Sequence, residues 1–349
     1  MKFRTLLAAA AGAMMLVSGT TAALAEKLVI SNWDGYMPKD MAEKFKAATG
    51  IDLEIAVHAT NEEIMGKVTA SGGEGYDVLF VSSPFAEALN NLGFLAPIDH
   101  AKTPNLANLY PEANELKHDP GNTFSVPYAW GTTGLCYRSD MVKTEPTSWN
   151  DLLSPTDDLK GKITMLSTDR WLMAAGFLAD GLSVNTTDQA DLDKVRDQLI
   201  ATKRNLLAYD DTTFYSKLVS GEAMMVQAWD GWCNYGITDK PEIKYVIPKE
   251  GSDLWVDTMV ITKASKNPEA AAKFIDFVLN AENGKWVVEN IMYKSPNKAG
   301  MEAVDKSMFE KYPNMAITPA ELLKFEQLRD LGNGMKAFSK TVSEVMAAK

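Results

Sequence analysis

Short strands alternate with amphipathic helices along this chain, and that alternation limits the folds it can adopt. Residues 28–30 read as a buried strand, and residues 38–50 read as a helix that Pro38 opens and Gly50 ends. Alternating apolar residues then predict a half-buried strand over residues 51–57, and a second helix follows over residues 62–70. This order of elements is typical of an α/β domain.

Residues 76–81 (YDVLFV) form a mostly apolar run of the kind found in a central strand that is covered on both faces. The run ends in Ser82, Ser83 and Pro84. Open α/β sheets bind ligands beyond the carboxyl ends of their strands. We therefore expect part of a binding site after residue 81.

The second half of the chain predicts another α/β unit and strands that connect the two. Residues 125–137 form a long extended segment that could cross between units, and residues 254–261 form a strand that could return. Further elements are expected at residues 163–166, 170–179, 188–202, 223–229, 244–248 and 268–279. A chain that crosses more than once makes a hinge between two lobes.

The first residues have the pattern of an export signal. Lys2 and Arg4 precede an apolar run over residues 6–17, and Ala23 and Ala25 flank Leu24 in the small-x-small pattern of a cleavage site. We expect residues 1–25 to be removed and the mature chain to begin near Glu26, outside the cytoplasm in the periplasm. A membrane anchor is less favoured because the run is short for a bilayer core of about 30 Å.

Composition restricts the partners. The 46 acidic and 35 basic residues give a net charge of -11, so the surface should repel nucleic acid and attract cations. Cys136 and Cys233 are the two cysteines of a chain expected in a compartment that permits disulfides. We favour two buried, unpaired thiols, because nothing in the sequence fixes their separation.

Signs of catalysis or of a metal site are missing from the sequence. His58, His100 and His118 stand outside zinc-binding spacings, and the chain has no G-x-S-x-G nucleophile motif. The glycine-rich residues 71–75 precede a strand instead of opening a helix, so they do not match a phosphate loop. We expect no enzymatic activity, no cofactor and no metal.

Aromatic residues do occur beside carboxylates near strand ends. Trp33 and Asp34 follow the first strand, Trp229 lies near Asp230 and Trp232, and Trp255 lies two residues before Asp257. An ammonium group needs a carboxylate to accept its hydrogen bonds and gains from aromatic faces by cation–π attraction. Each tryptophan could instead be ordinary core, but the recurrence of the pattern favours a site for an amine.

At these residues the sequence resembles the spermidine/putrescine-binding periplasmic proteins of bacterial ABC importers, over nearly the whole mature chain. The matching stretches are Asn32-Trp33 with Tyr36, residues 125–131 (SVPYAWG), residues 147–152 (TSWNDL), Trp229 with Gly231, residues 248–251 (PKEG), residues 255–257 (WVD), Tyr293 with residues 295–297 (SPN), and Gln327.

The resemblance implies an α/β, two-lobed periplasmic-binding-protein fold of type II with crossing hinge strands. One lobe would comprise residues 26–133 plus about 257–300, and the other residues 134–256 plus about 301–349. Ligand-contacting positions would be Trp33, Asp34, Tyr36, Ser83, Phe85, Trp171, Asp211, Trp229, Trp232, Trp255, Asp257, Tyr293 and Gln327. Asp257 would accept hydrogen bonds from an ammonium, and the tryptophans would pack on the alkyl chain.

Departures from the family pattern bear on the ligand. Gly35 and Trp171 stand where polyamine binders usually carry acidic residues, and Phe85 stands where a tyrosine is common. Asp211, at a position that is often serine, could restore one charge. A site with one or two carboxylates favours a putrescine-like diamine over spermidine, because an unpaired buried ammonium is costly.

Two classes of alternative remain open, a binder of another ligand on the same fold and an exported enzyme. A binder of an amino acid such as 4-aminobutyrate would need a cation for the ligand carboxylate, for which Arg170 is the nearest candidate, and a binder of a quaternary amine would use the aromatic cluster as a cage. An exported enzyme is the less favoured reading. For a binding protein we expect a small cationic amine as ligand, ABC permease subunits of the inner membrane as partners, and a monomeric chain.

Overall fold

The computed structural model describes residues 27–349, so the predicted leader and its cleavage site before Glu26 lie outside the described residues. Among residues 27–349, no helix combines the length and apolar composition that a membrane span requires.

The strands of the described chain are β1 (Lys27–Trp33), β2 (Asp52–His58), β3 (Val78–Ser82), β4 (Val126–Arg138), β5 (Ile163–Met165), β6 (Ala208–Tyr209), β7 (Met225–Trp229), β8 (Ile243–Val246), β9 (Asp253–Ile261) and β10 (Glu326–Gln327). The α-helices are α1 (Met41–Thr49), α2 (Asn61–Ala70), α3 (Ser83–Asn91), α4 (Asn150–Leu153), α5 (Asp169–Ala179), α6 (Gln189–Lys203), α7 (Phe214–Ser220), α8 (Asp230–Asp239), α9 (Pro268–Leu279), α10 (Ala281–Ile291), α11 (Lys298–Ala303), α12 (Lys306–Lys311), α13 (Pro319–Leu322) and α14 (Met335–Ala347).

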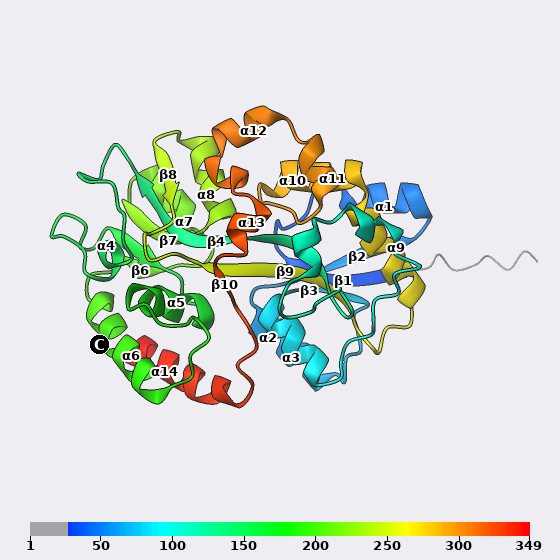
Figure 1. Cartoon of the computed structure of the whole chain (residues 1–349), viewed down its shortest axis with the longest axis horizontal. Helices are drawn as coiled ribbons and strands as arrows, with labels where there is room; N and C mark the ends of the chain where they lie inside the picture. The colour runs from blue at the N-terminus through cyan, green and yellow to red at the C-terminus, as the bar shows by residue number, and fades with distance from the viewer. Residues whose placement is uncertain (1–26) are drawn as a thin grey trace, which may run out of the picture.

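The strands form two lobes that share β4 (Figure 1). In the first lobe β2, β1 and β3 are parallel, and β9 pairs antiparallel with β3. The first part of β4 pairs with β9, whereas its last residues lie between β7 and β8 of the second lobe. There β5 is parallel to both β7 and β6. The predicted strand crossing over residues 125–137 is confirmed, and so is the return over residues 254–261.

The predicted central strand is β3, which is buried at every position. Val78 and Phe80 face the larger apolar cluster, whereas Leu79 and Val81 face a smaller one beneath α2 and α3. Burial on both faces explains why this segment is an apolar run without alternation. The first helix, α1, begins at Met41, not at the predicted Pro38, and ends with Gly50 at a left-handed φ of 77°.

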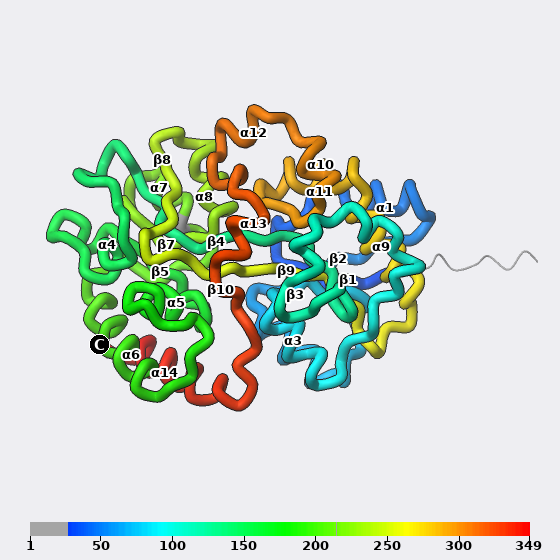
Figure 2. Tube along the Cα trace, viewed as in Figure 1, coloured from blue at the N-terminus to red at the C-terminus, as the bar shows by residue number. Residues whose placement is uncertain are grey.

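The lobes are linked by three segments (Figure 2). Two are β4 and β9, and the third contains β10, which pairs in parallel with the start of β9 before the chain continues to α14. Arg170 of α5 donates to the backbone oxygen of Arg329 in this third segment, and the Arg329 side chain pairs with Glu87 of α3. The segment therefore contacts both lobes. The lobe boundaries given above remain a prediction.

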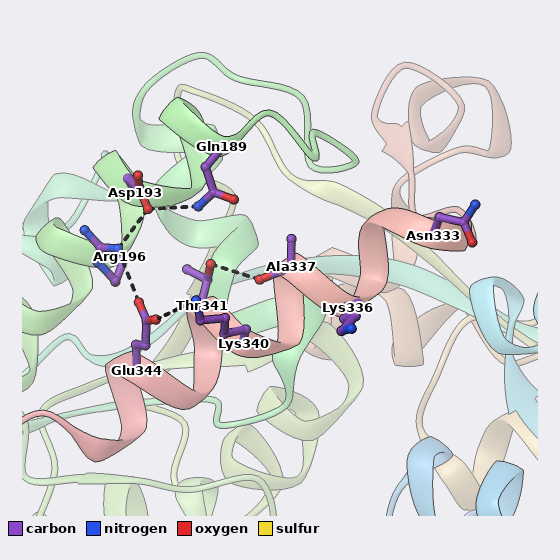
Figure 3. Close-up of a pocket in the computed structure, with 9 residues that line it drawn as sticks. All are labelled: Gln189, Asp193, Arg196, Asn333, Lys336, Ala337, Lys340, Thr341 and Glu344. Atoms are coloured by element: carbon purple, nitrogen blue, oxygen red, sulfur yellow. Dashed lines mark hydrogen bonds and ion pairs between the residues drawn. The ribbon is translucent and has the colours of Figure 1, made fainter.

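A shallow groove of about 420 Å³ lies between α6 and α14 in the second lobe (Figure 3). Arg196 of α6 donates to Asp193 at 2.8 Å and to Glu344 of α14 at 3.2 Å. These charged walls neutralise one another across the helix interface. None of the predicted site residues lines this groove, so the candidate site is sought elsewhere.

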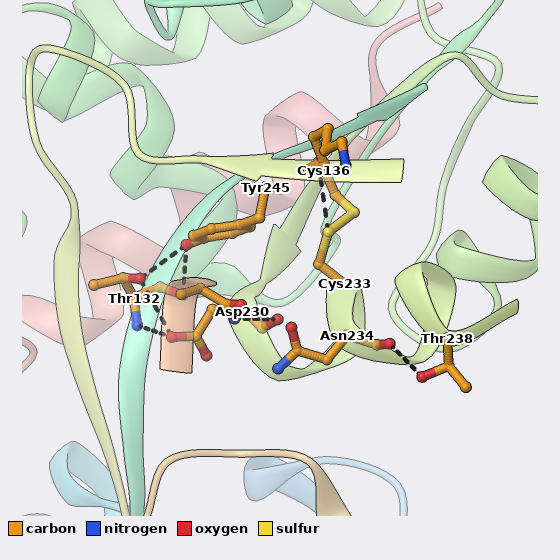
Figure 4. Close-up of a disulfide and its surroundings, with 9 residues drawn as sticks. Thr132, Cys136, Asp230, Cys233, Asn234, Thr238 and Tyr245 are labelled. Carbon is orange, nitrogen blue, oxygen red and sulfur yellow. Dashed lines mark hydrogen bonds between the residues drawn. A yellow bond between two sulfur atoms is a disulfide. The ribbon is translucent and has the colours of Figure 1, made fainter. Parts of the chain in front are cut away.

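Cys136 and Cys233 form a disulfide, with their α-carbons 5.8 Å apart (Figure 4). The expectation of two unpaired thiols was therefore wrong. The bond joins β4 to α8, whose first turn follows directly on Trp229. Both cysteines are fully buried, so the pairing depends on a tertiary contact between residues that are 97 positions apart in the sequence.

Candidate functional site

One face of β9 organises the candidate site. Side chains alternate along a strand, so Asp253, Trp255 and Asp257 point to the same side. The neighbouring strands extend this face, because Asp257 pairs with Ser82 of β3 and Trp255 pairs with Gly131 of β4. We call the side of the sheet that carries these residues the β9 face.

Asp257 is a half-buried carboxylate with two hydrogen-bond donors. Its Oδ1 accepts from the Ser82 hydroxyl at 2.6 Å, and its Oδ2 accepts from the Tyr36 hydroxyl at 2.8 Å. Burial raises the pKa of Asp257 to about 6, although both hydrogen bonds act in the opposite direction. Each oxygen has a further lone pair, so this carboxylate could also accept a hydrogen bond from a ligand ammonium.

Aromatic rings surround the Asp257 end of the β9 face. The Tyr36 ring makes edge contacts with Trp33, Tyr128 and Tyr293, at centroid distances of 5.5, 5.5 and 5.3 Å. Tyr293 in turn meets Trp255 at 5.5 Å. Trp33, Tyr36, Trp255, Asp257 and Tyr293 were predicted from sequence stretches far apart along the chain, and the structure brings all five together.

Two glycines allow this packing. A Cβ at Gly231 would lie 2.3 Å from the Tyr293 ring, and a Cβ at Gly131 would lie 2.4 Å from Trp255. Both distances are far below van der Waals contact, so the rings occupy the space that larger residues would fill. The two glycines therefore set how closely the aromatic residues approach the backbone.

The other end of the β9 face is covered from the second lobe. Trp229 of β7 pairs with Thr133 of β4, and the Trp171 ring of α5 meets Trp229 edge-on at 5.4 Å. Trp171 is buried, whereas Trp229 is half-buried. Trp171 and Trp229, two of the predicted residues of the second lobe, thus lie together at the opposite end of the β9 face from Asp257.

Four predicted residues lie in other surroundings. Trp232 stacks on Tyr215 of α7 at 5.3 Å, and Phe85 belongs to the smaller apolar cluster. Gln327 is buried, and its amide bonds the Lys117 backbone N–H at 2.8 Å and the His118 ring at 2.7 Å. The amide nitrogen of Gln327 also donates to the buried Ser83 hydroxyl at 3.4 Å. The polar groups of Gln327 are therefore used within the protein.

The two remaining predicted carboxylates lie in loops. Asp34 is exposed in the turn after β1, next to Gly35, whose φ of 68° favours glycine. Asp211 accepts hydrogen bonds from the backbone N–H and the hydroxyl of Ser167, just before α5.

Sequence reasoning missed three contributors. Ser82, rather than the predicted Ser83, contacts Asp257. Asn61 at the start of α2 fixes Ser82 through bonds to its N–H at 2.9 Å and its hydroxyl at 3.1 Å. Asp253 shares the β9 face with Asp257, which the two-residue period of the predicted strand could have indicated.

The third contributor is Glu62 of α2, which faces the second lobe. Its side chain is accessible, yet the surrounding protein displaces water and raises its pKa, and the charges of Asp169 and Asp211 add to this effect. These acidic side chains come from opposite lobes. No local pattern in the sequence indicates that they are close.

Comparisons with known proteins agree with this geometry. The family model described as bacterial extracellular solute-binding protein matches residues 40–317. A spermidine/putrescine-binding periplasmic protein of Haemophilus influenzae is 30% identical over 333 residues, which cover 94% of this chain and 91% of that protein. A putrescine/cadaverine-binding protein of Pseudomonas aeruginosa is 28% identical and covers 95% and 97%.

Solved structures extend the likeness to the fold. The spermidine/putrescine ABC transporter substrate-binding protein of Streptococcus pneumoniae superposes with a TM-score of 0.79 at 27% identity, covering 92% of this chain and 99% of that one. The resemblance inferred from short sequence stretches is thereby confirmed, together with the two-lobed fold. This chain belongs to the bacterial extracellular solute-binding protein family.

Proposed function

We propose that this chain is the extracytoplasmic solute-binding protein of an ABC importer and that it captures a putrescine-like diamine between its lobes. The observation that carries the proposal is Asp257, a half-buried carboxylate enclosed by aromatic rings. A carboxylate replaces the water that an ammonium loses on binding, and the rings attract the cation and pack on its methylenes.

The relatives support an amine as the ligand, because those named above are described as binding spermidine, putrescine or cadaverine. The balance of charge in the site supports a diamine. Gly35 and Trp171 contribute no carboxylates, and Asp211 is bonded to Ser167. The carboxylates that the family usually carries at positions 35 and 171 are therefore absent, which favours a ligand with fewer ammonium groups than spermidine.

Arg170 argues against a ligand that carries its own carboxylate. Its guanidinium is buried and donates to two backbone carbonyls and to the Asn185 side chain. These bonds use both Nη groups, and only the Nε–H is left without a partner, so Arg170 cannot offer a carboxylate such as that of 4-aminobutyrate the two parallel hydrogen bonds of a bidentate pair. Among the amines considered, a simple diamine is therefore favoured.

The proposal includes partners and location. Relatives of this chain are periplasmic binding proteins, and the leader predicted from residues 1–25 would export the chain to the same compartment. The bound amine would be delivered to permease subunits of the inner membrane by a monomeric chain, and no chemical change of the ligand is expected.

Calorimetric titration of the mature protein tests the proposal. Putrescine and cadaverine should bind more tightly than spermidine, 4-aminobutyrate or choline, and mass spectrometry should recover the amine unchanged. Tighter binding of spermidine would contradict the preference for a diamine. Failure of every amine to bind, or conversion of the amine, would remove the proposal itself.

A further inference from the structure

Asp253 lies on the same strand face as Asp257, at the opposite end of the candidate site. Four residues of extended chain separate their α-carbons by about 13 Å, and Trp255 stands between them on the same side. A long, flexible molecule lying along the β9 face would thus meet a carboxylate, an aromatic ring and a second carboxylate in turn.

The setting of Asp253 is unusual for a buried acid. Its side chain is 0% exposed, and neither carboxylate oxygen has a hydrogen-bond partner within the described chain. The Thr133 hydroxyl and the Trp171 indole N–H adjoin the carboxylate, but in this structure neither makes a well-formed hydrogen bond. Polar groups from three elements thus converge on one point without satisfying one another.

A structural carboxylate in this protein looks different. Asp119 is also buried, at 2% exposure, and accepts five hydrogen bonds from the backbone and side chains of residues 123–125. Burying an ionised group without such partners is costly. The contrast indicates that Asp253 is arranged for a partner that is not part of the chain.

Neighbouring cations do not fill this role. Arg170 is close enough for its charge to act on Asp253, but its two Nη groups donate to two backbone carbonyls and Asn185. Its Nε–H makes no hydrogen bond within the described chain, to Asp253 or to any other group. Lys294 is buried and is bound to Asp230 at 3.2 Å, so it neutralises that acid instead. Asp253 and Asp257 are therefore the acids of the β9 face that no ion pair neutralises within hydrogen-bond distance.

We infer that Asp253 is a second ammonium acceptor of the site, so that a ligand with an ammonium at each end lies along β9 across Trp255, between Asp257 and Asp253. This inference rests on the proposed function and specifies how a diamine is held. Asp253 then supplies, from β9, the carboxylate that the family pattern would place at position 171. Because Asp253 is fully buried and adjoins the Trp171 indole of α5, entry at this end requires a rearrangement that exposes Asp253.

Comparison of a diamine with a monoamine of equal chain length tests the inference. Wild-type protein should bind putrescine roughly 10- to 100-fold more tightly than 1-aminobutane, as expected for one additional charged hydrogen-bonded contact. Asp253→Asn keeps the shape of the side chain and should weaken putrescine by a similar factor. The affinity for 1-aminobutane should change less than about threefold, because its single ammonium binds at Asp257.

Controls separate the possible failures. Asp77→Asn alters another buried acid, at the opposite end of β3 from Ser82, and should leave both affinities unchanged. Equal loss for both amines in Asp253→Asn would overturn the inference by assigning Asp253 a structural role. A wild-type protein that binds both amines equally would overturn it without any variant, whereas a protein that binds neither would contradict the proposed function as well.

Discussion

Asp253 and Asp257 of the β9 face carry the same chemical group, a carboxylate, in different surroundings. Asp257 is half-buried and is held by hydroxyls of Tyr36 and Ser82, both from the first lobe. Asp253 is fully buried beside Trp171 of the second lobe and lacks a well-formed hydrogen bond. One end is preorganised and accessible, whereas the other is covered and unsatisfied.

This difference indicates an order of events. A ligand ammonium should meet Asp257 first, because that carboxylate is accessible and its orientation is already fixed. The second contact would follow when the second lobe rearranges around Asp253. A preorganised acceptor loses little freedom on binding, whereas an acceptor that must be uncovered adds selectivity at some cost in affinity.

Removal of the Asp257 carboxylate should have the largest effect. Asp257→Ala leaves the ligand ammonium without its charged acceptor, and we expect putrescine binding to weaken by about 3 kcal/mol or more. Calorimetry measures the loss, and Asp257→Asn separates the charge from the hydrogen bonds. Unchanged binding in both variants would show that the ligand ammonium does not bind at Asp257.

Loss of the disulfide, which lies in the second lobe, should lower the stability of the protein without acting directly on the ligand. The Cys136→Ser/Cys233→Ser variant should lower the free energy of unfolding by about 3 kcal/mol, because the crosslink closes a long loop of the unfolded chain. Urea denaturation measures this value. At low denaturant the affinity for putrescine should stay close to wild type, because Asn234 and Tyr235 of α8 still bond the backbone of residues 291–292. A large loss of putrescine affinity with little loss of stability would contradict the prediction that the disulfide acts on stability and not on binding.

Gly231→Ala should disturb the Asp257 end by a smaller amount. The new Cβ would overlap the Tyr293 ring, and overpacking of this kind costs about 1–3 kcal/mol. Displacement of Tyr293 should weaken putrescine binding roughly tenfold, as measured by calorimetry. Gly66→Ala in α2 is the matched control, because its Cβ meets nothing within 4 Å. Equal effects of the two variants would rule out the contact with Tyr293 as the cause.

Much of the fold could be predicted because its signals are local. The apolar run of β3 and the proline that begins α9 each depend on a few neighbouring residues, and α9 occupies residues 268–279 as predicted. The disulfide could not be predicted in this way, because it depends on the distance between β4 and α8 in the folded chain.

The residues of the site also differ in whether a local pattern in the sequence could indicate them. Trp255 and Asp257 were identified from an aromatic residue and an acid two positions apart. The end of β3 was expected to carry part of the site, but Ser83 was named instead of Ser82, because the place of Ser82 beside Asp257 depends on the antiparallel register of β3 and β9. Asp253 was missed because the feature that singles it out, a buried carboxylate without hydrogen-bond partners, can be seen only in the tertiary structure. For the same reason the sequence did not indicate that Gln327 is bonded to His118.

Acid should weaken the Asp257 contact in a defined range. Burial raises the pKa of Asp257 to about 6 in the folded, unliganded protein, and a protonated carboxyl cannot pair with an ammonium. Putrescine affinity should therefore be constant above pH 7 and fall below pH 6, with Asp257 contributing up to about tenfold per pH unit. Burial also raises the pKa of Asp253 to about 6, so the second acceptor adds to the fall. Calorimetry across pH 5 to 8 measures the curve. Asp257→Asn should lack this component, and an unchanged slope in that variant would assign the titration to another group.

Binding is a cleaner measure of this titration than stability. A carboxyl with a raised pKa takes up its proton more readily in the folded state, so the Asp257 contribution to stability increases as the pH falls from about 6 towards 4. His58 and His118 act in the opposite direction, because burial lowers their pKa values to about 4. The unfolded chain then takes up protons first, and their contributions decrease below about pH 6.5.

The smallest effect is expected from Ser82→Ala, which removes one of the two donors to Asp257. The Ser82 hydrogen bond lowers the pKa of this carboxyl, so its loss should move the pH midpoint of putrescine binding upward from about 6. Near pH 8 the affinity should change less than about fivefold, because Tyr36 still orients the carboxylate. The same titrations measure both quantities, and Tyr36→Phe provides the matched removal of the other donor. A downward shift in both variants would show that the hydroxyls do not stabilise the ionised acid, and the preorganised end of the β9 face would then resemble the Asp253 end.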